Sequence, residues 1–209
     1  MTVWGRILAL FLIVGMLSAC SRDAPPPEPT ENRTETPPPV SAPISPSVST
    51  ADTLPLDQVR KSQPGAVAQR VATTEITITY SRPVARGREL FGQLVPFDQV
   101  WHPGADRATA IAFSRDVHIN ERPLAAGKYS LWTIPREQGD WTMIFSRKGD
   151  VFHHPYPGEA DDALRIGVTP QQGPHVETLT FEFPVVDGKD AILRLHWGTV
   201  IVPMSIRVQ

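Results

Sequence analysis

Residues 177–208 read ETLTFEFPVVDGKDAILRLHWGTVIVPMSIRV and decide the fold class of this chain. Apolar and polar side chains alternate in residues 177–183, 191–197 and 200–208. This alternation is typical of β-strands that bury one face. Asp187-Gly188 lies between the first two segments and is a turn signal. The stretch therefore predicts consecutive antiparallel strands that turn their apolar faces toward one core.

Similar segments recur upstream and extend the β prediction to residues 65–209. Alternating or β-branched runs occupy residues 75–81, 117–120, 128–134, 141–146 and 164–168. Residues 135–140 have the composition of a hairpin loop, and residues 120–123 read as a turn. No long amphipathic helix pattern is present. We expect a mainly β chain with a single antiparallel β-sandwich or barrel-like domain, of which a jelly roll is one form, and one long irregular loop near residues 82–106.

The first twenty residues, MTVWGRILALFLIVGMLSAC, have the features of an export signal. Arg6 precedes an apolar run over residues 7–17, which has the length of a signal-peptide core and is short for a bilayer span. The run ends in Leu-Ser-Ala-Cys at residues 17–20, which resembles the lipobox of bacterial lipoproteins. This resemblance implies a signal peptide over residues 1–19 and a lipidated Cys20. An ordinary secretory signal or an uncleaved anchor is the alternative.

Residues 20–64 predict a disordered, proline-rich tether between the anchor and the domain. Eleven of the chain's 22 prolines lie in residues 21–64, and no aromatic residue does. Such a segment cannot bury enough apolar surface to offset the entropy lost on ordering. We expect a protein anchored in the cell envelope, on the outer membrane facing the periplasm, because Ser21 follows the cysteine instead of aspartate. The whole chain carries a net charge of −2, which argues against nucleic-acid binding.

Several blocks of the domain resemble one bacterial family. They are RPxxxGRxxFGxLVPxxxVW at residues 82–101, the Gly104-Ala105 pair, GxYSLxxIP at residues 127–135, WTxIF at residues 141–145 and Tyr156 followed by Asp162-x-x-Arg165. Together they resemble the domain of unknown function 2911, over nearly all of residues 73–209. The resemblance implies an exported or lipid-anchored β-rich domain and implies no reaction. It also implies VWRTGAN where this chain reads VWHPGAD at residues 100–106.

Arginines are the first candidates for a ligand site. Residues 65–209 hold twelve arginines and three lysines, and arginine suits bidentate binding of carboxylates and phosphates. An anionic small molecule or an envelope component is the expected ligand or partner. The candidate ligand-binding residues are Arg82, Arg86, Arg88, His102, Asp106, Arg107 and Arg165. The alternative, which we favour for the arginines, is structural pairing with Glu89, Asp98, Asp106 or Asp162.

A metal site and an aromatic platform are the other candidates. His102, Asp106 and His153 have side chains that bind zinc or a related ion, although solvated loop histidines are the simpler interpretation. His118, His175 and His196 are expected at the surface. The tryptophans of the domain could form a sugar-binding platform, but core positions are the preferred interpretation. The sequence shows no G-x-S-x-G element.

The sequence therefore favours a non-enzymatic, membrane-anchored ligand-binding or interaction domain. The alternative is a small envelope hydrolase that uses a metal or a pair of carboxylates, with His102 and Asp106 as its residues. The sequence identifies no cofactor and does not fix the oligomeric state.

Overall fold

The computed structural model describes residues 61–209, which form two antiparallel β-sheets. The strands are β1 (Ser62–Val71), β2 (Thr74–Pro83), β3 (Ala110–Phe113), β4 (Val117–Ile119), β5 (Arg122–Leu124), β6 (Gly127–Ile134), β7 (Trp141–Ser146), β8 (Asp162–Val168), β9 (Gln171–Asp187) and β10 (Asp190–Val208). A 3₁₀ turn, η1 (Glu159–Asp161), precedes β8. The expected signal peptide of residues 1–19, Cys20 and nearly all of the expected tether lie outside the described residues.

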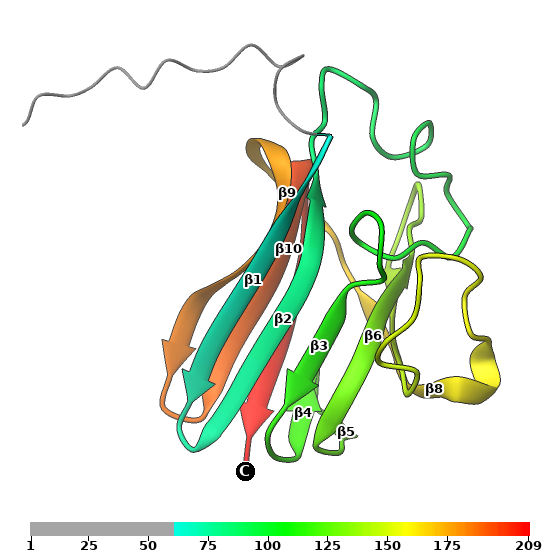
Figure 1. Ribbon diagram of the computed structural model, residues 1–209. Helices are drawn as coiled ribbons and strands as arrows, with labels where there is room; N and C mark the ends of the chain where they lie inside the picture. Colours follow the sequence, from blue (N-terminus) through cyan, green and yellow to red (C-terminus); the bar gives the residue numbers. More distant parts are fainter. Residues whose placement is uncertain (1–60) are drawn as a thin grey trace, which may run out of the picture. The chain divides into compact units, whose positions relative to one another are not determined.

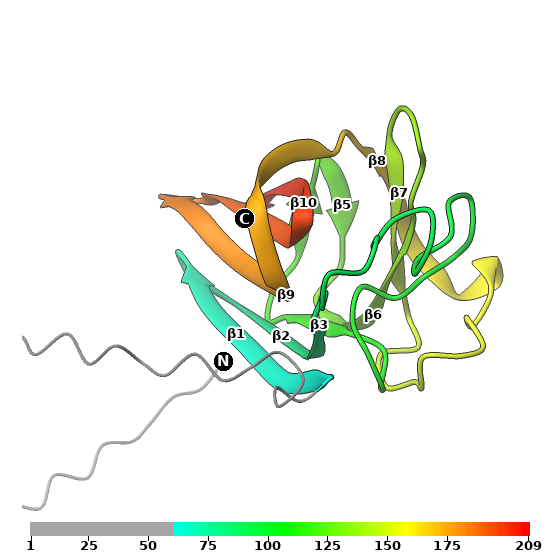
Figure 2. The same cartoon turned by 90° about the horizontal axis from the view of Figure 1, so that it is seen from above.

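The two sheets form a sandwich. One sheet has the strand order β1-β2-β3-β6-β7-β8, and the other has the order β5-β4-β10-β9. Figure 2 looks down on the layers, with β9 and β10 facing the sheet that begins with β1 and β2. The sheets pack face to face and do not close into a barrel. The prediction of a β-sandwich is therefore confirmed, and the barrel-like alternative does not apply.

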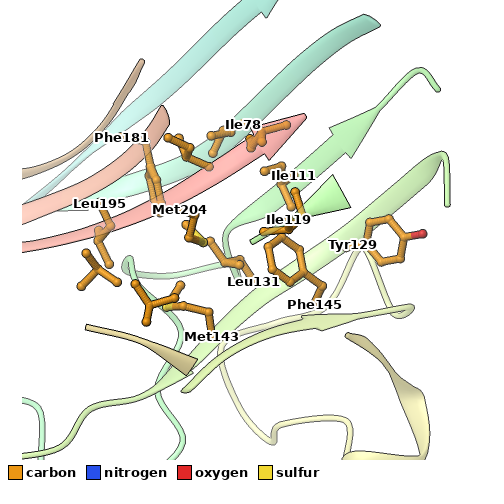
Figure 3. Close-up of a cluster of buried hydrophobic side chains, with 14 of the residues drawn as sticks. Ile78, Ile111, Ile119, Tyr129, Leu131, Met143, Phe145, Phe181, Leu195 and Met204 are labelled. Atoms are coloured by element: carbon orange, nitrogen blue, oxygen red, sulfur yellow. The ribbon is translucent and has the colours of Figure 1, made fainter. Parts of the chain in front are cut away.

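Alternation along the strands places the apolar side chains between the sheets. Ile76 and Ile78 of β2 are fully buried, as are Leu131 of β6 and Leu193 of β10. Figure 3 shows part of this core, where side chains from both sheets interdigitate. The same alternation turns polar side chains outward, which is why the pattern could be read from the sequence.

Strand β10 doubles back on itself. The N–H of Val208 donates to the carbonyl of Lys189 over 2.9 Å, so the two ends of this 19-residue strand lie side by side. Figure 1 shows the chain rising as the first half of β10 and descending as the second. Gly198 lies at the reversal with φ +58°, a conformation that costs a residue with a Cβ about 1–2 kcal/mol. The separate strands predicted at residues 191–197 and 200–208 are therefore the two halves of β10.

The alternation of apolar and polar residues did not predict three of the strands, which are short or lie at a sheet edge. Strand β1 begins at Ser62, three residues before the expected start of the domain, and contains Pro64 and Gly65. Both residue types are rare inside strands and are tolerated here because β1 is an edge strand. Strand β3 has four residues and β5 has three. The predicted turn at residues 120–123 ends within β5, because Asn120 and Glu121 alone make the left-handed turn between β4 and β5.

A second apolar cluster lies on the outer face of the larger sheet. Ala108, Trp132 and Ile144 are buried there, and Tyr156 packs against them. The loops at residues 101–109 and 147–161 cover this face, seen beside β6 and β8 in Figure 1. Within residues 61–209, no helix is long and apolar enough to cross a membrane.

Candidate functional site

The long loop between β2 and β3 is fixed by an arginine that bonds to the loop itself. The guanidinium of Arg88 donates from Nε to the carbonyl of Ala85 over 2.9 Å and from Nη2 to the carbonyl of Val84 over 2.6 Å. Val84 in turn forms an isolated bridge with Thr178 of β9. Arg88 therefore closes the start of the loop into a tight turn against β9.

Two further arginines attach the same region to β9. Arg82 donates from Nε to the carbonyl of Leu179 over 3.1 Å, and the backbone N–H of Arg86 donates to Glu177 Oε1 over 2.6 Å. The pKa of Glu177 is lowered, first by a hydrogen bond from His175 and then by the Arg86 N–H. Arg82 and Arg88 thus bond to backbone carbonyls and not to the carboxylates expected as their structural partners.

A groove opens at the end of the sandwich where β1 begins. It consists of two adjoining hollows of about 320 and 280 Å³ that share Arg88 and Trp197. We call it the end groove and define it by Lys61, Arg88, Phe91, Trp101, Asp106, His175 and Trp197. Together the hollows have the size of ordinary small-molecule sites.

Stacked aromatic rings form one wall of the end groove. The rings of Trp101 and Trp197 stack with centroids 6.0 Å apart and planes inclined by 17°. Phe91 meets the edges of both rings. Trp101 is held by two backbone hydrogen bonds with Thr133, of 2.8 and 2.7 Å. Trp197 is buried whereas Trp101 is half-buried, so Trp101 is the ring with free surface at the groove.

Charged groups of both signs line the end groove. Lys61 and Arg88 provide cations, and Lys61 makes no ion pair with the residues that the structure describes. The carboxylate of Asp106 accepts a hydrogen bond from the Ser62 hydroxyl over 2.8 Å. That bond joins the end of the loop to the first residue of β1. The groove therefore offers net positive charge beside a flat aromatic surface.

His102 belongs to the same loop and is turned away from the solvent. Its side chain is 6% exposed, packs edge-on against Trp132 and stacks on His153 at a centroid distance of 5.9 Å. Its Nδ1 has no hydrogen-bond partner within residues 61–209. Burial first, and then the nearby His153, lower the pKa of His102 to about 4. His102 is therefore a neutral, buried ring at neutral pH.

The three expected metal ligands do not assemble a metal-binding cluster. His153 faces the backbone carbonyl of Asp106, 2.8 Å from its Nδ1, and not the Asp106 carboxylate. In the described part of the chain, no three His, Cys, Asp or Glu side chains are placed to hold one metal ion together. His102 and His153 thus meet as stacked rings, an arrangement that explains their proximity through packing alone.

The other two candidate arginines lie elsewhere. Arg165 projects from β8 and pairs with Glu159 at 2.5 Å and with Asp162 at 3.6 Å. Asp162 also accepts a hydrogen bond from the Tyr156 hydroxyl over 2.5 Å, and burial raises the pKa of both groups. This arrangement fixes the covering loop at residues 147–161 to the sheet. Arg107 lines a different pocket, on the outer face of the larger sheet.

The predicted site residues therefore divide among separate places. Only Arg88 and Asp106 line the end groove, where sequence reasoning missed Lys61, Phe91 and His175. Lys61 was assigned to the tether, and the contribution of β9 follows from sheet pairing that no local pattern reveals. His196 was expected at the surface but is 7% exposed, because residues 173–174 fold over it and the Pro174 carbonyl lies 3.0 Å from its Nε2.

The core interpretation of the tryptophans is confirmed for three of the four. Trp132, Trp141 and Trp197 are at most 2% exposed, and Trp101 is half-buried at the groove. The indole N–H of Trp132 donates to the Ser130 hydroxyl over 2.8 Å, so its polar atom is satisfied inside the protein.

Comparison with known proteins agrees with the blocks quoted from the sequence. No curated protein and no solved structure matches this chain. Residues 62–206 match the family described as "Protein of unknown function (DUF2911)". The match starts at the first residue of β1, ends two residues before the end of β10, and so covers both sheets. The chain therefore belongs to the DUF2911 family.

Proposed function

We propose that this chain is a lipid-anchored envelope protein whose β-sandwich binds a small anionic molecule with a ring-shaped body, such as an acidic sugar. The observation that carries the proposal is the end groove, where the half-buried ring of Trp101 lies beside Arg88 and Lys61. The groove is built from the RPxxxGRxxFGxLVPxxxVW block together with β1, β9 and β10.

The chemistry of the groove favours such a ligand over a purely apolar or purely ionic one. A flat aromatic face packs against the apolar face of a sugar ring, while arginine and lysine bind a carboxylate. Two nitrogens of Arg88 are engaged with carbonyls, so the guanidinium is held still with its remaining nitrogen available to a ligand. A preorganised cation loses less entropy on binding than a mobile one.

Binding of glucuronate tests this proposal. We expect glucuronate to bind at least about tenfold more tightly than glucose, since a hydrogen bond between charged groups contributes about 1.5–3 kcal/mol. Lys61→Gln should weaken glucuronate binding several-fold because it removes a positive charge from the groove. Trp101→Leu should weaken the binding of both glucuronate and glucose because it removes the aromatic ring. Calorimetric titration of the detergent-solubilised full chain measures these affinities.

The control variant for this titration is Arg136→Gln. Arg136 pairs with Asp98 at the surface, outside the end groove, so its removal should leave both affinities unchanged. Equal affinity for glucuronate and glucose, or binding that neither Lys61→Gln nor Trp101→Leu alters, would contradict the proposal.

The anchored location rests on the sequence of residues 1–20, with its apolar core and the Leu-Ser-Ala-Cys end. Multiple acyl chains on Cys20 would hold the protein firmly at the membrane, and Ser21 after the cysteine favours the outer membrane.

We expect Cys20→Ser to abolish incorporation of a labelled palmitate analogue into the protein. Ser21→Ala serves as the control and should keep the label. Unchanged labelling of Cys20→Ser, with the protein still sedimenting with membranes, would contradict lipidation.

The alternative of a small envelope hydrolase gains no support from residues 61–209. The Asp106 carboxylate accepts a hydrogen bond from the Ser62 hydroxyl, and His102 is buried and does not line the end groove. No observation places a pair of carboxylates or a metal-binding cluster in that groove.

A further inference from the structure

A separate, open pocket lies on the outer face of the larger sheet. Its volume is about 200 Å³, and residues of β2, β3 and the loops at residues 107–108 and 149–151 line it. We call it the outer pocket; the residues that matter here are Thr79, Ser81, Arg107, Ala108, Asp150 and Val151. None of these residues lines the end groove. The two pockets can therefore be tested independently.

The walls of the outer pocket are held in place by backbone contacts. Arg107 and Phe152 form an isolated antiparallel bridge, and the N–H of Ala108 donates to the carbonyl of Val151 over 3.2 Å. Gly149 passes so close to β6 that a Cβ there would lie 2.8 Å from the Lys128 carbonyl oxygen. Only glycine permits this approach. The two loops that carry the charged groups are thus tied to each other and to the sheet.

The outer pocket holds one cationic and one anionic group that do not pair with each other. Within residues 61–209, the guanidinium of Arg107 makes no ion pair and no side-chain hydrogen bond. Asp150 Oδ1 accepts a bond from Lys128 Nζ over 2.6 Å, which leaves Oδ2 for another donor. The hydrogen bond from Lys128, helped by the charge of Arg107, lowers the pKa of Asp150 and keeps its carboxylate ionised.

We propose that the outer pocket binds a zwitterionic α-amino acid with a small side chain. The ligand carboxylate lies at Arg107 and its ammonium at Asp150, which matches charge to charge. The hydroxyls of Thr79 and Ser81 provide further polar partners, and Ala108 and Val151 pack against the side chain. A volume of about 200 Å³ suits alanine or serine, whereas the larger end groove suits a ring.

Titration with L-alanine and two truncated analogues tests this inference. Propionate lacks the ammonium and ethylamine lacks the carboxylate. We expect each analogue to bind at least about tenfold more weakly than L-alanine to the detergent-solubilised full chain, because each leaves one charged group of the pocket without its partner. Arg107→Gln should weaken the binding of L-alanine but leave the binding of ethylamine unchanged. Asp150→Asn should weaken the binding of L-alanine but leave the binding of propionate unchanged.

Glucuronate binding provides the control for this experiment. Both variants lie outside the end groove and should keep the wild-type affinity for glucuronate, which also shows that they remain folded. Failure of glucuronate to bind the wild type would overturn the proposed function and leave the alanine result intact. Absence of L-alanine binding, equal binding of L-alanine and either analogue, or an affinity unchanged by both variants would overturn the outer-pocket proposal.

Discussion

Replacing Trp197 by alanine should lower the free energy of unfolding by about 3–5 kcal/mol, the range measured when buried Phe and Trp are truncated. Trp197 is 2% exposed and lies in the main core beside Phe91 and Trp101. Its indole N–H donates to the carbonyl of Glu177 over 3.3 Å, so truncation also removes one of the two hydrogen bonds that this carbonyl accepts, the other coming from the N–H of Ala85. The same substitution removes the wall of the end groove.

Urea unfolding followed by circular dichroism measures this loss, with Trp101→Ala as the matched control. Trp101 stacks on the same ring but is half-buried, so we expect its removal to cost less stability. Trp197→Phe keeps a large apolar ring and should recover part of the loss. Equal destabilisation by Trp101→Ala and Trp197→Ala would contradict the assignment of Trp197 to the core and of Trp101 to the groove surface.

The protein should lose stability in mild acid through His102. The pKa of His102 lies near 4 in the folded protein, against 6.5 for an ordinary histidine. The unfolded chain therefore takes up this proton more readily than the folded one does. The stability that the protein gains from a neutral His102 is fully present above pH 6.5. It declines as the pH falls from 6.5 to 4, and it is lost below about pH 4. The difference in pKa corresponds to about 3 kcal/mol.

Urea unfolding of the wild type and of His102→Gln between pH 8 and pH 4 isolates this contribution. Carboxylates titrate in both proteins, so the His102 effect is the difference between the two curves. We expect the wild type to lose about 3 kcal/mol more than the variant over this interval. His153 and Asp106 are the neighbours that affect the pKa of His102, and both remain in the variant. Parallel curves would contradict the prediction.

Acid should also loosen the loop that lines the end groove. His102 packs on Trp132, and Trp101 and Asp106, on either side of it in the chain, both line the groove. A charge on the His102 ring would be desolvated beside an indole and close to His153. Protonation of His102 would therefore act on the segment between these two groove residues.

Most strands could be predicted from the sequence because each buries one face. The apolar side chains of residues 177–183, 191–197 and 200–208 alternate, and the structure turns them inward as expected. Strand β1 could not be predicted in this way, since Pro64 and Gly65 break the pattern and only one of its ten residues is fully buried. It pairs with β2 through a two-residue turn, in which Val71 lies opposite Thr74.

The candidate site was predicted less completely than the fold. The block at residues 82–106 does form the irregular loop, and Arg88 and Asp106 do line a groove. The seven candidate ligand-binding residues do not line one groove, because Arg82 bonds to the Leu179 carbonyl, Arg165 pairs with Glu159 and Arg107 lines another pocket. Which partner an arginine reaches depends on carbonyls and carboxylates brought close by distant strands.

The sequence alone determined the β class, the inward face of most strands, the position of the loop and the resemblance to the DUF2911 family. These features follow from periodicity and from local residue types, which act over a few neighbouring residues. Only the tertiary structure decided that β10 doubles back beside β9, that Lys61 and His175 join Trp101 at one groove, and that His102 is buried. These features depend on contacts between residues far apart in the chain, and no local pattern encodes which segments will meet.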